Sequence, residues 1–141
     1  MKKRILALLT ILTIALGLTA CGGDDTTVFT EVNTVEGVSL VLKEGTLKPS
    51  KGVFILTNDS DTDVVYDPVE YHLEKLKKDV WEENIGTRSS SWKRDKTETL
   101  AAGESKEISI NWKGLCGAIN GGQHRVIIIV NGEPVAAEFE K

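Results

Sequence analysis

The feature that most constrains the fold is a period of two in the apolar residues from Gly37 to the end of the chain. Residues 38–43 alternate, so that Val38, Leu40 and Leu42 share one face, as side chains do on a β-strand. Residues 53–57 are apolar on both faces, which is typical of a strand in the middle of a sheet. This period predicts sheets rather than helices.

The same period organises the last third of the chain. Residues 124–130 form the most apolar run after residues 1–20 and predict a central strand. Asn131-Gly132 predicts a hairpin turn, followed by a last strand over 135–140. The alternation predicts that these side chains face one core: Ile108, Ile110 and Trp112 before a glycine-rich corner, His124, Val126 and Ile128 after it, and Ala137 and Phe139 in the last strand.

Residues 64–83 admit two interpretations. Alternation over 64–66 and again over 71–76 predicts strands, with a turn at 77–79 leading into Val80-Trp81. A helix over 69–83 is the alternative, because Leu73, Leu76 and Val80 have helical spacing. The aromatic and β-branched residues and the Pro68 start favour the hairpin. Residues 85–99 predict a long polar connection with one short edge strand.

Together, residues 37–141 predict six to eight short strands at regular spacing. This number and spacing are typical of an antiparallel β-sandwich. We therefore expect an all-β protein with a single sandwich domain.

Residues 1–20 have the composition of an export signal: Lys2-Lys3-Arg4, an apolar core over 5–16, and small residues before Cys21. A membrane-spanning helix is one alternative, but it needs about 20 apolar residues, and the apolar core over 5–16 is shorter. The ending Leu18-Thr19-Ala20-Cys21 resembles the lipobox of bacterial lipoproteins. That resemblance implies cleavage before Cys21 and attachment of lipid to its sulfur. A signal peptide that is cleaved without lipidation is the second alternative.

These features predict a protein attached to the cell membrane through the lipid on Cys21, at the extracytoplasmic face. Residues 21–36 are rich in Gly, Asp, Thr and Glu and predict a flexible tether, which would hold the domain of residues 37–141 about 20 Å from the bilayer. Val28-Phe29 is the part of this tether that could dock on the domain.

Loss of residues 1–20 would lower the formal net charge from −4 to −7. We therefore expect no nucleic-acid partner, because phosphates require a basic surface, and we expect repulsion from anionic head groups. With Cys21 carrying lipid, Cys116 has no cysteine to pair with. We expect its thiol to be buried and inert.

Several short motifs resemble the bacterial immunoglobulin-like domains of small lipoproteins, and the likeness covers most of residues 37–141. They are Leu100-Ala101-Ala102-Gly103-Glu104-Ser105, Leu115-x-Gly117-x-Ile119, Gly122-x-His124-Arg125-Val126 and Ala136-Ala137-Glu138-Phe139. Members of that family usually carry Pro, Tyr and Tyr where this chain has Ala102, Cys116 and His124. The resemblance implies an immunoglobulin-like sandwich with no established catalytic chemistry.

An acidic segment has the spacing of a calcium-binding loop. Its acids are Asp59, Asp61, Asp63, Asp67 and Glu70. However, the position that must turn sharply holds Val64 rather than Gly, Pro68 interrupts the segment, and no helix is expected on either side. We therefore expect a solvated turn, with no metal and no other cofactor.

Cys116 with His72 or His124 would be the residue types of a thiol nucleophile and its base, but the sequence positions no third group beside them. The resemblance places His124 where relatives use a Tyr to fix a corner, which favours a structural role. We therefore expect no catalytic residue. Trp92, between Ser91 and Lys93, is the candidate for an exposed binding contact.

These observations favour a non-enzymatic, lipid-anchored module that binds a protein or a component of the cell envelope. A proteinase-inhibitor-like binding module is the alternative, since some small bacterial immunoglobulin-like proteins resemble inhibitors. An enzyme is the third class and would need a cleft with clustered, perturbed side chains.

Overall fold

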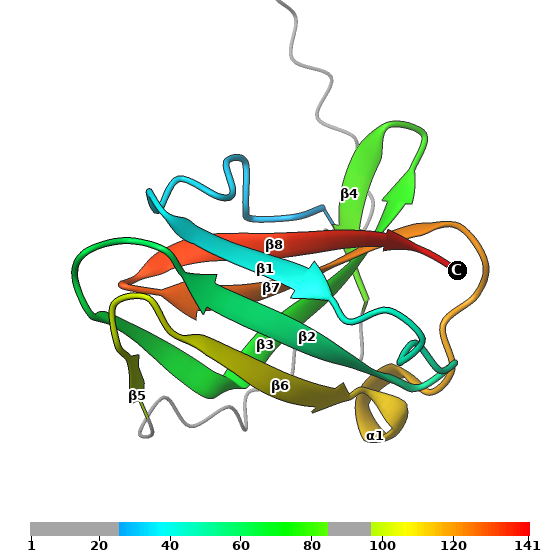
Figure 1. Cartoon of the computed structure of the whole chain (residues 1–141). Coiled ribbons are helices and arrows are strands. Elements are labelled where there is room, and N and C mark those ends of the chain that lie inside the picture. The colour runs from blue at the N-terminus through cyan, green and yellow to red at the C-terminus, as the bar shows by residue number, and fades with distance from the viewer. Residues whose placement is uncertain (1–25, 85–96) are drawn as a thin grey trace, which may run out of the picture.

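The computed structural model describes residues 26–84 and 97–141 (Figure 1). This part of the chain contains eight strands and one short helix. In chain order they are β1 (Val38–Leu42), β2 (Lys51–Asn58), β3 (Val64–Lys77), β4 (Val80–Glu83), β5 (Glu98–Leu100), β6 (Ser105–Asn111), α1 (Lys113–Cys116), β7 (Gln123–Val130) and β8 (Glu133–Glu140).

The strands form two antiparallel sheets that pack face to face. One sheet has the order β1-β2-β6, and the other has the order β4-β3-β7-β8 with β5 paired to β3. Strands β1 and β8 run next to each other where the two sheets meet (Figure 1). The all-β sandwich expected from the sequence is confirmed. The described residues contain no helix long and apolar enough to cross a membrane.

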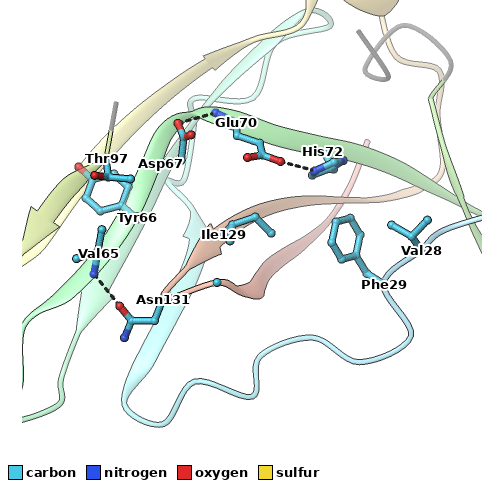
Figure 2. Close-up of a pocket in the computed structure, with 11 residues that line it drawn as sticks. Val28, Phe29, Val65, Tyr66, Asp67, Glu70, His72, Thr97, Ile129 and Asn131 are labelled. Atoms are coloured by element: carbon cyan, nitrogen blue, oxygen red, sulfur yellow. Dashed lines mark hydrogen bonds and ion pairs between the residues drawn. The ribbon is translucent and has the colours of Figure 1, made fainter. Parts of the chain in front are cut away.

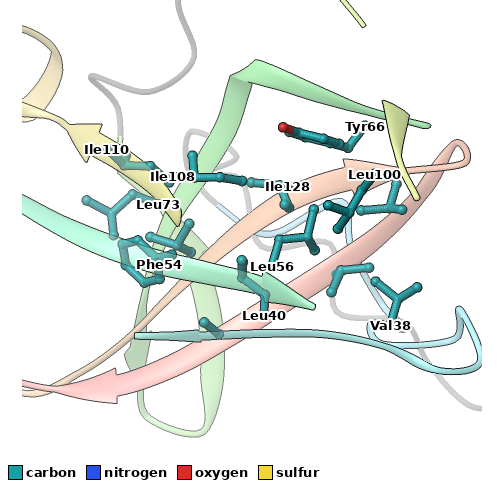
Figure 3. Packing of buried hydrophobic residues seen from close by; sticks show 14 of the residues in the cluster. Val38, Leu40, Phe54, Leu56, Tyr66, Leu73, Leu100, Ile108, Ile110 and Ile128 are labelled. Atoms are coloured by element: carbon teal, nitrogen blue, oxygen red, sulfur yellow. The ribbon is translucent and has the colours of Figure 1, made fainter. Parts of the chain in front are cut away.

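The core lies between the sheets and contains the side chains that the period of two placed there (Figure 3). Ile108, Ile110 and Trp112 are all buried, and Trp112 is fully so. Its indole N–H donates a hydrogen bond to the Pro49 carbonyl at 3.0 Å, which satisfies the one polar group of a buried tryptophan. The inward positions expected in the last two strands also face this core, with Phe139 only partly buried.

Two hairpin turns fix the register of the larger sheet. Asn131 and Gly132 both have positive φ and join β7 to β8, with Val130 opposite Glu133. Lys78 and Asp79 also have positive φ and join β3 to β4, with Lys77 opposite Val80. Two-residue turns of this kind match the twist of the strands that they connect. The hairpin expected around 77–79 is therefore confirmed, and the helical alternative is wrong.

Strand β3 is one long strand rather than the two segments expected from the sequence. Against β7, Tyr66 pairs with Val130 and the next pair is Tyr71 with Ile128, so β3 carries a bulge of extra residues between Tyr66 and Tyr71. The bulge resets the alternation, because Tyr66 before it and Leu73 after it both face the core although they are an odd number of residues apart.

Candidate binding site

The side of the five-stranded sheet that faces away from the core, here called the outer face, is covered in part by residues 26–36, here called the strap. The strap begins beside β4, where the Thr27 amide donates a hydrogen bond to the Trp81 carbonyl at 3.0 Å. It ends beside β8, where the Asn33 amide bonds to the Pro134 carbonyl and the Asn33 side-chain oxygen accepts from the Ala136 amide. The flexible tether expected over 21–36 is therefore wrong from Thr26 onward, because specific contacts hold these residues on the domain.

The strap buries side chains of the outer face. Strand β7 alternates between Val126 and Ile128, which face the core, and Arg125 and Ile127, which face outward. Ile127 is nevertheless 0% exposed and Arg125 is 4% exposed. Phe29 of the strap packs edge-on against the ring of His72 on β3, with 4.7 Å between the ring centroids. The outer face therefore has a small core of its own beneath the strap.

A buried ion pair lies within this second core. The Arg125 Nε donates to Oε2 of Glu74 at 2.5 Å, and the side chains are 5% and 1% exposed. The Trp81 ring lies over the guanidinium, 4.5 Å from its carbon to the ring centroid, a cation–π arrangement. The Arg125 Nη2 also donates to the Phe29 carbonyl at 3.3 Å. Arg125 therefore ties the strap to β3 and β7.

Next to the strap the outer face is hollowed by a pocket of about 610 Å³. Figure 2 shows it between Val28 and Phe29 of the strap, the bulge of β3, and the end of β7. Its apolar lining comes from Val28, Phe29, Val65 and Ile129. Val28 and Val65 are large apolar side chains that remain exposed, at 76% and 43%. Exposed apolar side chains that gather around a hollow are typical of a binding surface.

The bulge of β3 supplies the acidic side of the pocket. The Asp67 Oδ1 accepts hydrogen bonds from the amides of Val69 and Glu70 at 2.9 and 3.1 Å, a local turn that aspartate favours. Pro68 lies inside this turn, where its missing N–H costs no sheet hydrogen bond. The local sequence Asp67-Pro68 therefore builds the bulge and sets Asp67 and Glu70 at the edge of the pocket.

His72, further along β3, lies between two carboxylates. Its Nδ1 is 2.7 Å from Glu83 Oε1 and its Nε2 is 3.6 Å from Glu70 Oε1. At the other end of the pocket, the Tyr66 hydroxyl donates to Glu98 Oε2 at 2.6 Å. Burial raises the pKa of Tyr66, and the hydrogen bond to the Glu98 carboxylate adds to the rise. The pocket therefore combines an apolar floor with negative charge along β3.

Cys116 and His124, which have the residue types of a catalytic pair, instead have structural roles at the corner after β6. The His124 Nε2 donates to the Asn120 carbonyl at 2.8 Å and the ring stacks on Phe139, as expected for a residue that fixes a corner. Burial lowers the pKa of His124 and raises the pKa of the Cys116 thiol. Cys116 is half-buried rather than fully buried. A thiol with a raised pKa is a poor nucleophile.

The acids that suggested a calcium loop do not gather at one point. Asp59 and Asp61 lie in the turn between β2 and β3, whereas Asp67 and Glu70 belong to β3 and are buried in its bulge. The Asp63 Oδ1 accepts from the Ala102 amide at 3.0 Å. No group of three potential metal ligands occurs in residues 26–84 and 97–141. That the protein needs no calcium stays a prediction.

The two site residues predicted from the sequence, Cys21 and Trp92, lie outside the described residues. Lipidation at Cys21 and a binding contact at Trp92 therefore stay predictions. Sequence reasoning missed the pocket and the ion pair of Arg125 with Glu74. The Val28-Phe29 pair was the one signal of the strap, and the Asp67-Pro68 step was a signal of the bulge.

The sandwich and its turns are those of an immunoglobulin-like domain. Residues 34–140 match the family described as bacterial Ig-like domain, so this chain belongs to that family. Domains of this family are generally non-catalytic.

Other comparisons add little. No curated protein matches the sequence. A solved structure of a β-glucosidase from Kluyveromyces marxianus in complex with glucose is similar over 73% of this chain, with 16% sequence identity and a TM-score of 0.35. The match covers 13% of the glucosidase chain. At this TM-score the likeness has no bearing on what the protein does.

Proposed function

We propose that this protein is a lipoprotein held by lipid on Cys21 at the extracytoplasmic face of the cell membrane, and that its Ig-like domain binds a protein or envelope component without catalysing a reaction. The observation that carries the binding role is the pocket on the outer face, with exposed Val28 and Val65 at its edge. Exposed apolar surface is costly in water, and a partner that covers it contributes free energy of association.

The state of the titratable groups supports binding over catalysis. His72 contacts Glu83, Arg125 contacts Glu74, and His124 donates to a backbone carbonyl. Each of these contacts holds one structural element to another. An activated nucleophile needs a nearby base and a lowered pKa, and the pKa of Cys116 is raised.

The test is capture from a detergent extract of the cell envelope, with the acylated protein as bait. Val65→Gln replaces an exposed apolar side chain at the pocket. Val41→Gln is the matched control, because Val41 on β1 is 50% exposed and belongs to the other sheet. We expect a partner that the wild type and Val41→Gln retain and that Val65→Gln loses. Equal retention by all three proteins would place the binding surface elsewhere, and capture of a proteinase would favour the inhibitor-like alternative.

A further inference from the structure

The charges at the pocket favour one kind of partner group. Of the eleven described residues that line it, two are carboxylates, one is a histidine and none is Lys or Arg. Two further carboxylates contact residues of the lining, since Glu83 is bonded to His72 and Glu98 to Tyr66. Within residues 26–84 and 97–141 the sole arginine is Arg125, and its charge is already matched by Glu74.

The shape of the lining places this charge next to apolar surface. In Figure 2, Asp67 and Glu70 lie along β3, and Ile129 and Phe29 lie across from them on β7 and the strap. A group in the pocket therefore meets carboxylates on the β3 side and apolar side chains on the side of β7 and the strap. Lysine and arginine have this division, with an apolar stem and a cationic head.

Other occupants fit less well. An anion would be repelled by the carboxylates of Asp67 and Glu70, and a purely apolar group would take water from them without replacing it. A bound metal ion would need several ligands close together, and the described residues hold no such group. An organic cation with an apolar stem satisfies both parts of the lining.

We propose that the pocket on the outer face receives a lysine or arginine side chain of a partner protein, with the stem on Val65, Phe29 and Ile129 and the cationic head at Asp67 and Glu70. This proposal rests on the proposed function, because it names the chemistry of the partner at the same site. The mature formal charge of −7 expected for this protein would also steer a basic partner toward it.

The test uses the acylated, ¹⁵N-labelled protein in nonionic detergent micelles and two short peptides. The probe is acetyl-Leu-Arg-Leu-amide, and the control is the same peptide with citrulline, which keeps the shape of arginine without its charge. We expect the arginine peptide to shift the amide NMR signals of Val65 and Ile129 in a saturable way. The citrulline peptide should bind about tenfold more weakly, because hydrogen bonds to charged groups are the stronger ones.

Three variants locate the charge. Glu70→Gln and Asp67→Asn should each weaken the binding of the arginine peptide by about tenfold. Asn at position 67 keeps the oxygen that accepts from Val69 and Glu70, so this variant retains the bulge if Glu70→Gln folds poorly. Glu44→Gln is the control, because it removes the same charge from the exposed turn after β1, and it should bind as the wild type does.

Equal binding of the two peptides, or an equal effect of Glu44→Gln and Glu70→Gln, would overturn the preference for a cation. If only NMR signals of residues outside the pocket shifted, the proposed location of the binding site would be wrong. Neither result bears on envelope capture and its dependence on Val65, so the proposed function would stand or fall separately.

Discussion

Arg125 and Glu74 form a buried ion pair on the side of the sheet that faces away from the sandwich core. The two atoms in contact are 2.5 Å apart. Glu74 comes from β3 and Arg125 from β7, and these residues are direct neighbours in the register of the two strands. The pair is therefore a cross-strand contact that also holds the strap, through Arg125 and Phe29.

Loss of one partner of this pair should be far more harmful than loss of both. Arg125→Met leaves the Glu74 carboxylate buried without its cation, and we expect it to lower the free energy of unfolding by about 3 to 5 kcal/mol. The double variant Arg125→Met with Glu74→Leu should recover much of this loss. Chemical denaturation of the wild type, both single variants and the double variant measures the coupling. Additive losses would show that the two side chains act independently.

Phe29 should hold the strap in place, whereas its neighbour Val28 should not. Phe29→Ala removes the contact with His72, and we expect a loss of about 1 to 2 kcal/mol, below the cost at a fully buried site. Val28→Ala is the control, because that side chain is 76% exposed, and it should change stability by less than about 0.5 kcal/mol. Thermal unfolding and limited proteolysis near the N-terminus report the two effects. If both variants were cut as slowly as the wild type, Phe29 would not be the residue that fastens the strap.

The two tyrosines should ionise only at strongly alkaline pH in the folded protein. Burial raises the pKa of Tyr71 to about 12, with a further contribution from Cys116, and the pKa of Tyr66 is raised as well. Above about pH 10 the unfolded chain releases these protons first, so stability should fall as the pH rises from that point. Ultraviolet titration of tyrosinate, with Tyr66→Phe and Tyr71→Phe to assign each step, checks this. A step near pH 10 in the folded protein would contradict it.

Cys116 should be structural and slow to react. Cys116→Ala removes a half-buried thiol and should cost about 1 to 2 kcal/mol, whereas Trp112→Ala removes the largest fully buried side chain and should cost about 3 to 5 kcal/mol. A thiol reagent should modify the folded protein more slowly than the unfolded chain, because burial raises the thiol pKa. Rapid modification of folded protein, or activity lost in a well-folded Cys116→Ser variant, would revive the enzyme interpretation.

Cys21 should carry lipid. Cells given a fatty-acid analogue should label the wild type, and Cys21→Ala should take up no label and should leave the membrane fraction. Cys116→Ala is the matched control and should be labelled as the wild type is. Equal label in the wild type and Cys21→Ala would refute the lipoprotein assignment.

The sandwich could be predicted from the sequence because its core depends on local alternation. Ile108 and Ile110 face inward with the parity of an ordinary strand, and Asn131-Gly132 is a turn signal that neighbouring residues define by themselves. The apolar run over 124–130 is apolar on both faces because β7 is buried on both faces, by the other sheet on one and by the strap on the other.

The candidate site could not be predicted in the same way. Arg125 looks like a solvent-facing residue in an alternating strand, and its burial depends on Glu74 and Phe29, which are far away in the sequence. The bulge of β3 changes the parity within one strand, so alternation counted from Val64 places Leu73 on the wrong face. The pocket depends on the strap, which covers residues far away in the sequence, and on the bulge of β3. Neither feature produces a periodic pattern in the sequence.

The strap also constrains the order of events while the chain is made and folds. Thr27 and Arg125, which contact each other in the folded protein, are 98 residues apart. The N-terminal residues leave the ribosome first, but their place on the outer face does not exist until β7 and β8 have followed. The strap must therefore stay undocked until nearly the whole domain has been made, and the covering of the outer face is one of the last steps in folding.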